Sequence, residues 1–330
     1  MRHPLDLISE GFYPDGMHSL SPELQNKERT LLDDLRGRGR LLIAFSGGVD
    51  SSYLAWAARR ALGDDCLAVT AVSPSYPVSH RAMAEDIVRD FDIPHRFVST
   101  HEMESVEYRR NAPDRCYHCK SELFSRMDDL LDELGFDALA YGINTDDQGD
   151  FRPGHRAAEE HRVLSPLLAA GLSKQEIRTL SQRAGLPCWN LPASACLASR
   201  LPYGTEVTAE RLSQVDRGEG LLRELGLRQV RLRHHGEIAR IEIDPAECAG
   251  GISPELMRNI AKVIKPLGFK WVCLDLEGYR MGSLNEALSN DVLSNEALSN
   301  EALSNEAPSN TGPGSQVRVD FGLPVLPSAK

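Results

Sequence analysis

A short stretch near residue 50 has the residue types that bind a polyphosphate. It reads Ser-Gly-Gly-Val-Asp-Ser-Ser and follows an apolar segment. Paired glycines let the backbone turn tightly, and the free amides that open a helix face an anion together with neighbouring hydroxyls. Asp50 can hold the Mg²⁺ that accompanies phosphates. No lysine stands where a Walker loop requires one, so transfer of a γ-phosphate is not favoured. The candidate nucleotide-binding residues are Ser46, Gly47, Gly48, Val49, Asp50, Ser51 and Ser52.

Simpler interpretations of this region remain open. A Gly-Gly turn can merely join a strand to a helix. Ser73 follows the next apolar segment, where a fold of this kind would meet the adenine and ribose of a nucleotide, but a serine at a strand end can also be only a turn residue.

Three cysteines form a second chemical group. Cys116 and Cys119 make a Cys-x-x-Cys pair, expected in a loop just before a helix, and Cys196 lies much later in the chain. Three thiolates can hold a [4Fe-4S] cluster with one iron left open to an outside ligand. Alternatively, His118 or Cys188 could complete a closed zinc site, or the pair alone could be redox-active.

Two groups of polar residues could bind an anionic substrate. Ser199 and Arg200 lie close behind Cys196, so Arg200 could neutralise a substrate carboxylate or an adenylate. Arg231 and Arg233 alternate along one predicted strand, which suits a phosphate clamp but also an ordinary charged strand face. Arg200 could likewise be a surface arginine.

The elements that must position these residues alternate between strands and helices. This order predicts an α/β fold with a doubly wound parallel sheet, whose ligand lies at the carboxyl ends of the strands. We expect strands at residues 40–45, 66–72, 95–98 and 137–142, and helices after Ser21 and at 49–62, 79–91, 120–134 and 173–184.

The pattern changes after residue 204 and indicates a smaller α+β domain. It comprises helices at 206–225 and 253–265, a hairpin of 229–234 and 237–243, and a strand at 269–275. The predicted organisation is an N-terminal extension (1–20), a nucleotide domain (21–204), the small domain (205–283) and a tail (284–330). Residues 286–310 of the tail are five near-copies of one pentapeptide, which favours disorder over a partner-binding segment.

Composition narrows the function classes. The net charge of −11 argues against a broad nucleic-acid surface. The longest apolar run near the N-terminus, Leu41–Phe45, is too short to cross a membrane, and no apolar stretch typical of a signal peptide follows Met1. We therefore expect a cytoplasmic protein with reduced thiols that acts on a small molecule.

The loop at residues 46–52 resembles the signature of the PP-loop ATP pyrophosphatases. Between about Leu31 and Ser283 the chain resembles one of their branches, the LarE family, which comprises ATP-dependent sulfur transferases of nickel-pincer nucleotide cofactor synthesis. The resemblance rests on the loop and on the segments 114–120, 141–154, 192–203, 230–242 and 278–280.

The resemblance implies a mechanism. A carboxylate of a pyridinium dicarboxylate mononucleotide is adenylated by ATP and Mg²⁺, and sulfur then displaces AMP. The cysteine that matches Cys196 is the essential sulfur site. Members that also have the Cys-x-x-Cys pair hold a [4Fe-4S] cluster with three cysteines and pass on an extra sulfide, whereas others give up the sulfur of that single cysteine. This chain, with Cys116 and Cys119, looks like the first kind.

The resemblance also implies partners and further site residues. Arg231 and Arg233 match phosphate-binding positions, and Arg240 and Glu242 match neighbouring site residues. Asp147 is a further candidate for metal or substrate contact, although an acidic loop residue can also be only solvated. A homo-hexamer and a source of sulfide or a sulfur carrier are expected.

Three rival functions remain open at this point. A tRNA thiolase would need an RNA surface, which the acidic charge disfavours. An ammonia-using synthetase would leave the three cysteines without a role. A nucleotide sensor with a zinc-bound loop would bind ATP without releasing pyrophosphate.

Overall fold

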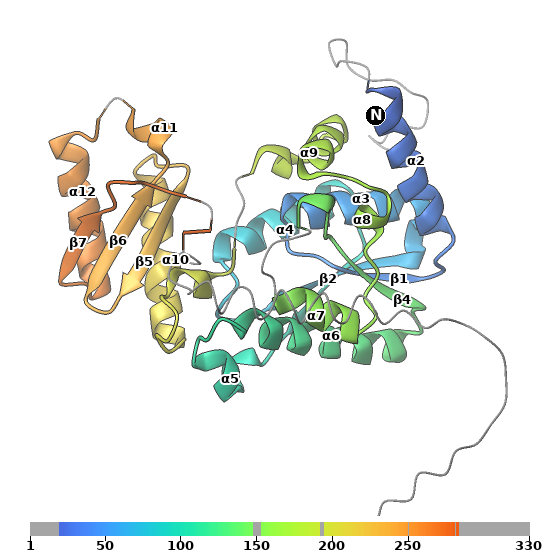
Figure 1. Ribbon diagram of the computed structural model, residues 1–330, viewed down its shortest axis with the longest axis horizontal. Helices are drawn as coiled ribbons and strands as arrows, with labels where there is room; N and C mark the ends of the chain where they lie inside the picture. Colours follow the sequence, from blue (N-terminus) through green and yellow to red (C-terminus); the bar gives the residue numbers. More distant parts are fainter. Residues whose placement is uncertain (1–19, 148–152, 192–194, 250, 281, 284–330) are drawn as a thin grey trace, which may run out of the picture.

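The computed structural model describes residues 20–147, 153–191, 195–249, 251–280 and 282–283 (Figure 1). The predicted N-terminal extension, apart from Leu20, and the predicted tail after residue 283 lie outside the described residues. In the described ranges no helix is both long enough and apolar enough to cross a membrane.

The larger part of the molecule is built on a parallel sheet. Its order is β3 (His95–Ser99), β2 (Cys66–Val72), β1 (Leu41–Ala44) and β4 (Ala138–Tyr141), and all three neighbouring pairs are parallel. The two central strands are the most apolar, because helices bury both of their faces. The predicted α/β fold with a doubly wound parallel sheet is confirmed.

Helices cover both faces of this sheet. One apolar core joins the sheet to α2 (Pro22–Arg36), α3 (Val49–Leu62), α4 (Val78–Asp90) and α9 (Lys174–Arg183), and a second joins its other face to α6 (Arg115–Leu134) and α7 (Pro153–Glu160) (Figure 1). The short helices α5 (Val106–Arg109) and α8 (Pro166–Ala169) lie in the connections. Helix starts follow local signals, as in the capping box of Ser173 and Glu176.

The start of α6 corrects one prediction. Cys116 and Cys119 lie inside the first turns of this helix and not in a loop before it. The helix begins at Arg115, whose buried side chain donates to the carbonyl of Ala198 at 2.9 Å. A contact across so many residues has no local sequence signal, so the predicted helix began too late.

The smaller domain packs two helices on one face of a mixed sheet. Strands β5 (Val230–His235) and β6 (Ile238–Ile243) are antiparallel, and β7 (Trp271–Leu274) adds in parallel to β6. Helices α10 (Ala209–Glu224) and α12 (Pro254–Ile264) bury their apolar sides against the sheet, and the short α11 (Pro245–Cys248) follows β6. The α+β character of this domain is confirmed.

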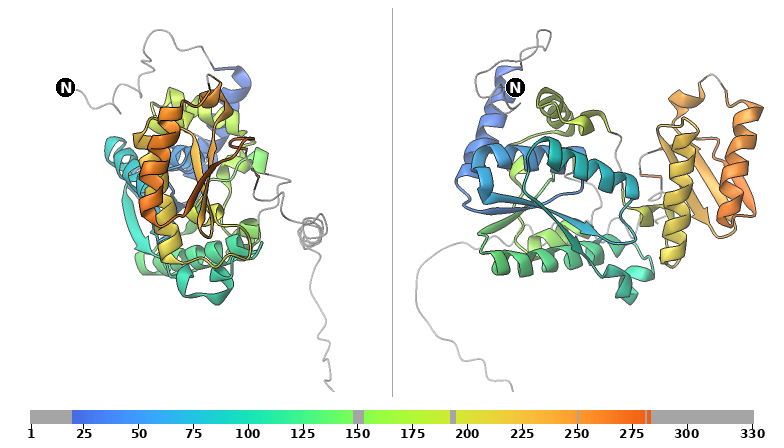
Figure 2. Two further views of the ribbon diagram at one scale, coloured as in Figure 1. Left: turned by 90° about the vertical axis from the view of Figure 1, so that its left-hand side faces the viewer. Right: turned by 180° about the vertical axis from the view of Figure 1, so that it is seen from behind.

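The small domain lies at the end of the larger one where α4 begins (Figures 1 and 2). There the carboxylate of Asp216 on α10 accepts a hydrogen bond from the amide of Val78, the first residue of α4, at 3.3 Å. This contact joins the two domains beside the carboxyl end of β2, where the predicted site residues gather.

Candidate active site

The loop between β1 and α3 adopts a compact turn that opens a helix. Gly47 has a φ of 75°, which favours glycine, and Gly48 is the N-cap residue of α3. The hydroxyls of Ser46 and Ser51 lie 3.0 Å apart, and Ser46 Oγ accepts from the amide of Gly48 at 3.4 Å. The loop therefore presents small residues and hydroxyls at a helix N-terminus, as an anion site requires.

The end of β4 packs directly against this loop. A Cβ atom on Gly142 would lie 2.8 Å from the amide nitrogen of Ser51 and 2.9 Å from the carbonyl carbon of Asp50. Only glycine fits this approach without displacing the first turn of α3. Gly142 thus fixes the phosphate loop against its neighbouring strand.

Asp50 is half of an ion pair that the sequence did not reveal. Lys174, at the start of α9, places its Nζ 2.5 Å from Asp50 Oδ2. Burial raises the pKa of Asp50, the ammonium of Lys174 opposes that shift, and the carboxylate of Asp147 adds to it. Asp50 Oδ1 is buried and has no hydrogen-bond partner in the part of the chain that the structure describes. This orphaned oxygen and the nearby carboxylate of Asp147 fit a divalent cation.

Ser73, at the carboxyl end of β2, belongs to a buried polar network. Its hydroxyl and that of Ser75 both donate to Glu102, the second at 3.0 Å. Glu102 is only 3% exposed, which is rare for a carboxylate and gave no sequence signal. The carbonyl of Ser75 accepts from the amide of Leu197 at 3.0 Å, so this network is tied to the residue after Cys196.

Buried side chains form hydrogen bonds between the segment before α6 and the segment that carries Cys196. Besides the bond from Arg115 to Ala198, the side-chain amide of Asn111 donates through Nδ2 to the carbonyls of Pro202 and Thr205 at 2.8 and 2.9 Å. Asn111 is fully buried and has a φ of 56°, so it occupies a constrained position in the turn before α6. Tertiary structure thereby brings the start of α6 to the segment that carries Cys196.

The pKa shifts of Arg115 and Cys119 agree with the proximity of these two segments. Burial alone would lower the pKa of Arg115, but the thiols of Cys196 and Cys116 raise it above its ordinary value. Burial raises the pKa of Cys119, and Glu102 and the thiol of Cys196 raise it further. The guanidinium of Arg115 thus interacts with two of the thiols, and the third thiol interacts with both of them. Such a donor set fits an anionic cluster with three thiolate ligands.

The two residues proposed to complete a closed zinc site have other surroundings. Cys188 is buried in the apolar core under the phosphate loop, in a different cluster from Cys119 and Cys196. His118 faces Asp114, with its Nε2 3.4 Å from the carboxylate. Among the described residues, no three His, Cys, Asp or Glu side chains are grouped around a position for one metal ion.

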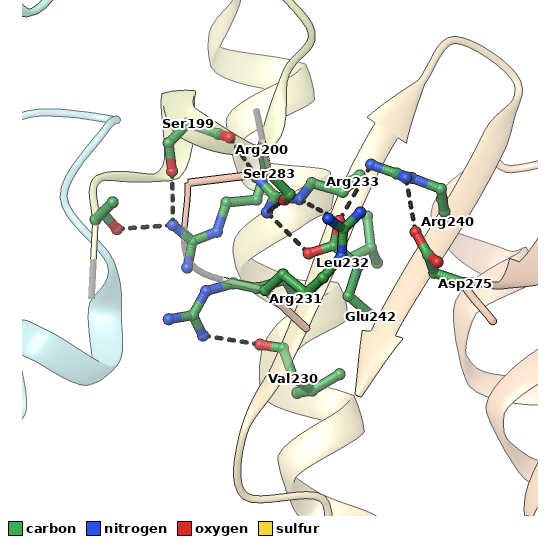
Figure 3. A network of polar contacts seen from close by, with 12 residues as sticks. Ser199, Arg200, Val230, Arg231, Leu232, Arg233, Arg240, Glu242, Asp275 and Ser283 are labelled. Carbon is green, nitrogen blue, oxygen red and sulfur yellow. Dashed lines mark hydrogen bonds and ion pairs between the residues drawn. The ribbon is translucent and has the colours of Figure 1, made fainter. Parts of the chain in front are cut away.

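Arg200 points into the protein and holds the Cys196 segment. It is 1% exposed, and its Nε lies 2.8 Å from Glu219 Oε1 on α10. Its Nη1 donates to the hydroxyl of Ser199 at 2.8 Å (Figure 3). The same nitrogen also donates to the carbonyls of Ala195 and Cys196 at 2.8 and 3.2 Å. This geometry makes Arg200 a positioning residue. Its predicted contact with a substrate stays a prediction.

Arg231 and Arg233 on β5 are buried and make defined polar contacts, whereas the side chains of an ordinary charged strand face lie in solvent. Arg233 makes a two-pronged ion pair with Glu242 at 2.9 and 2.8 Å and donates to the carbonyl of Ser199 at 2.8 Å (Figure 3). Arg240 bridges Glu242 and Asp275 at 3.1 and 2.7 Å. Arg231 lies over the ring of Tyr279 at 5.0 Å and donates to the carbonyl of Val230 at 2.9 Å.

Positive charge gathers at the junction of the two domains. Burial, together with Arg200, Arg223 and Arg231, lowers the pKa of His80 to about 4. A separate cavity of about 270 Å³ also lies between the two domains, and Ser73, Arg81 and Asp216 are among its lining residues. An anionic group bound at this junction would be stabilised by the surrounding guanidinium groups.

The chain is similar to known proteins over most of its length. No protein-family model matches it. An uncharacterised protein of Synechocystis is 41% identical over 266 residues, which cover 81% of this chain and 99% of that protein. The pyridinium-3,5-bisthiocarboxylic acid mononucleotide synthase of Lactiplantibacillus plantarum is 34% identical over 269 residues, covering 81% of this chain and 96% of the synthase. An uncharacterised protein of Methanocaldococcus jannaschii is 27% identical over 73% of this chain and 91% of its own length. Since the identity to the synthase extends over nearly the whole of that protein, the chain belongs to the LarE family.

Proposed function

We propose that this protein is an ATP-dependent sulfur transferase, which converts the carboxylates of a pyridinium dicarboxylate mononucleotide to thiocarboxylates in nickel-pincer cofactor synthesis. The proposal is supported by the similarity to the Lactiplantibacillus synthase. The observation that carries it is the hydrogen bond from the amide of Leu197 to the carbonyl of Ser75, which joins the segment of Cys196 to the carboxyl end of β2. Sulfur chemistry and nucleotide binding can therefore occur at one edge of the sheet.

The first step activates the carboxylate, because its oxygen is a poor leaving group. A carboxylate oxygen attacks the α-phosphorus of ATP, the bond to the bridging oxygen breaks, and pyrophosphate leaves. The amides and hydroxyls of residues 46–52 receive the pyrophosphate, and Lys174, now paired with Asp50, can neutralise part of its charge. Asp50, with Asp147 nearby, would hold Mg²⁺, which supplies further charge neutralisation when bound.

The second step forms the carbon–sulfur bond. Sulfur attacks the acyl carbon of the adenylate, the bond to the phosphate oxygen breaks, and AMP leaves with a thiocarboxylate remaining. Cys116, Cys119 and Cys196 would hold a [4Fe-4S] cluster, which supplies a bound sulfide as the nucleophile. Arg115 would compensate the negative charge there, and Arg200 would keep the Cys196 segment in place. Two carboxylates require two rounds.

The remaining parts of the proposal concern binding and supply. The phosphate of the mononucleotide would bind at the positive domain junction near Arg231. A sulfide source or sulfur carrier must reload the site after each round. We place the reaction in the cytoplasm, where the seven free cysteines stay reduced, and expect a homo-hexamer from the family resemblance.

The test uses the full chain purified without oxygen. Iron, zinc and acid-labile sulfide per chain are measured first, and then pyrophosphate and thiocarboxylate are followed with ATP and the pyridinium dicarboxylate mononucleotide. Asp50→Ala should abolish both products. Cys196→Ala should lose iron and thiocarboxylate but still release pyrophosphate, whereas Cys273→Ala, at an exposed thiol on β7, should behave as wild type.

Other outcomes would change the proposal. Pyrophosphate release by Asp50→Ala at the wild-type rate would remove the role of this aspartate. Zinc in place of iron, or no metal, would exclude the cluster. Conversion of Cys196 to dehydroalanine during turnover would then identify its own sulfur as the one transferred.

A further inference from the structure

Tyr108, in the short helix α5, has a buried hydroxyl that the fold does not use. The side chain is 1% exposed, and its hydroxyl oxygen has no hydrogen-bond partner among the residues that the structure describes. Buried polar atoms in proteins are almost always paired, because an unpaired one loses its bonds to water without replacement. An orphaned hydroxyl in so closed a position points to a partner that arrives with a ligand.

The side chain of Tyr108 packs in the cluster that borders two of the cysteines. Tyr108 belongs to the apolar cluster against which Cys119 and Cys196 pack. Burial raises the pKa of Tyr108, and charge on the thiols of Cys196 and Cys119 raises it further, in keeping with the packing of both cysteines against this cluster. Charge on two thiols from different segments of the chain therefore acts on the tyrosine hydroxyl.

The tyrosine is held rigidly. Ser105 caps its short helix by accepting from the amide of Tyr108 at 3.2 Å, and the carbonyl of Tyr108 accepts from the amide of Asn111 at 3.1 Å. The neighbouring carbonyl of Arg109 accepts from the amide of Val207 at 2.8 Å, just beyond the Cys196 segment. The same backbone that holds the cysteines thus holds the ring.

A nearby carboxylate takes the protons of the neighbouring hydroxyls. Ser75 lies close to Tyr108 but donates to Glu102 at 3.0 Å, and Ser73 donates to the same oxygen. Glu102 therefore accepts the protons of both serines. The phenolic proton of Tyr108 has no acceptor among the described residues and is available to one that enters the cysteine site.

We propose that Tyr108 is a further residue of the sulfur site, whose hydroxyl donates a hydrogen bond to the sulfur atom presented for transfer between Cys119 and Cys196. This inference rests on the proposed function. An anionic sulfur is a far better acceptor than a thiol, so the bond forms when the site is charged with transferable sulfur. It fixes the direction of the sulfur and stabilises its charge, and the tyrosine itself undergoes no covalent change.

The variant Tyr108→Phe removes only this hydroxyl. Because the hydroxyl is unpaired without ligand, the unloaded variant should melt at the wild-type temperature or above it. Formation of thiocarboxylate in a single turnover should fall roughly tenfold to hundredfold, the value of a hydrogen bond to a charged group, while pyrophosphate release is unchanged. In the iron-loaded protein the reduction potential should become more negative, since hydrogen bonds to cluster sulfurs favour the reduced state.

Tyr53→Phe is the matched control. Tyr53 is fully buried in the larger domain, and its hydroxyl donates to Glu28 at 3.2 Å. This control should lower the melting temperature of the unloaded protein but leave sulfur transfer and the reduction potential unchanged. The two variants therefore separate the loss of a structural hydrogen bond from the loss of one made to sulfur.

Two results would overturn the inference. One is a Tyr108→Phe protein with the wild-type transfer rate and potential, and the other is an unloaded variant destabilised as much as Tyr53→Phe. A wild-type protein that forms no thiocarboxylate would refute the proposed function instead, and the melting and potential comparisons would still decide the role of Tyr108. If the protein holds no iron, the rate of sulfur loss from Cys196 replaces the potential.

Discussion

The buried pair of Arg200 and Glu219 offers a direct test of what holds the Cys196 segment in place. Glu219 accepts from Arg200 at 2.8 and 3.2 Å, from Arg223 at 2.9 Å and from the amide of Leu232 at 3.3 Å. Glu219→Gln keeps the size of the side chain but removes its charge. It also turns one acceptor into an amide group that faces a guanidinium.

The expected magnitude follows from burial. The side chains of Arg200 and Glu219 are 1% and 2% exposed, so the variant leaves a guanidinium buried without a counter-ion. Breaking such a pair from one side costs about 3–5 kcal/mol. Arg223 is 33% exposed and regains water when released, so its loss adds little. We expect a loss of about 3–5 kcal/mol in the free energy of unfolding of the small domain.

Urea unfolding followed by circular dichroism measures this loss. Asp33→Asn is the control, because Asp33 pairs with Arg36 on the surface, where the side chains are 61% and 55% exposed, and should change stability by less than ~1 kcal/mol. Glu219→Gln should also slow sulfur transfer, since Arg200 holds the carbonyl of Cys196. A loss no larger than that of the control would refute the reasoning.

A double variant separates stability from function. Arg200→Met with Glu219→Leu leaves no buried charge at this position, so most of the stability should return. Sulfur transfer should stay slow, because methionine cannot bond the carbonyls of Ala195 and Cys196. Recovery of both properties together would show that the ion pair does not position the segment.

Two further predictions concern the phosphate loop and acid stability. Gly142→Ala should lower the free energy of unfolding by about 1–3 kcal/mol and weaken ATP binding in calorimetry, because its methyl group meets the backbone of Ser51. Gly220→Ala is the control and should be neutral or slightly stabilising, because the space around Gly220 is open. Equal ATP affinity in both variants would contradict this prediction. Burial would raise the pKa of Glu219, but Arg200 lowers it below its ordinary value. The stability it contributes is therefore present above the unfolded pKa of about 4.3 and lost as pH falls through the folded value. Unfolding free energies measured from pH 6 downward should fall more steeply for wild type than for Glu219→Gln, and parallel curves would speak against the assignment.

Part of this protein was determined by short-range sequence alone. The apolar run at β1, the glycines after it and the helix periodicity of α3 lie next to one another, so their spacing predicted both the elements and the loop between them. The N-caps Ser21, Ser173 and Ser253 begin their helices as the local pattern indicates. Such signals are readable because the interactions that cause them span only a few residues.

The partners of the site residues were decided by tertiary structure. Lys174 meets Asp50 across 124 residues, and neither residue type at its position distinguishes this pair from two solvated charges. The same holds for Glu102, which resembles a surface acid in the sequence but is buried beside Ser73 and Ser75. Arg200, expected to face a ligand, instead turns toward Glu219. Spacing along the chain fixes local backbone geometry, whereas burial and long-range pairing depend on how the two domains and the sheet pack, and only the folded structure sets them.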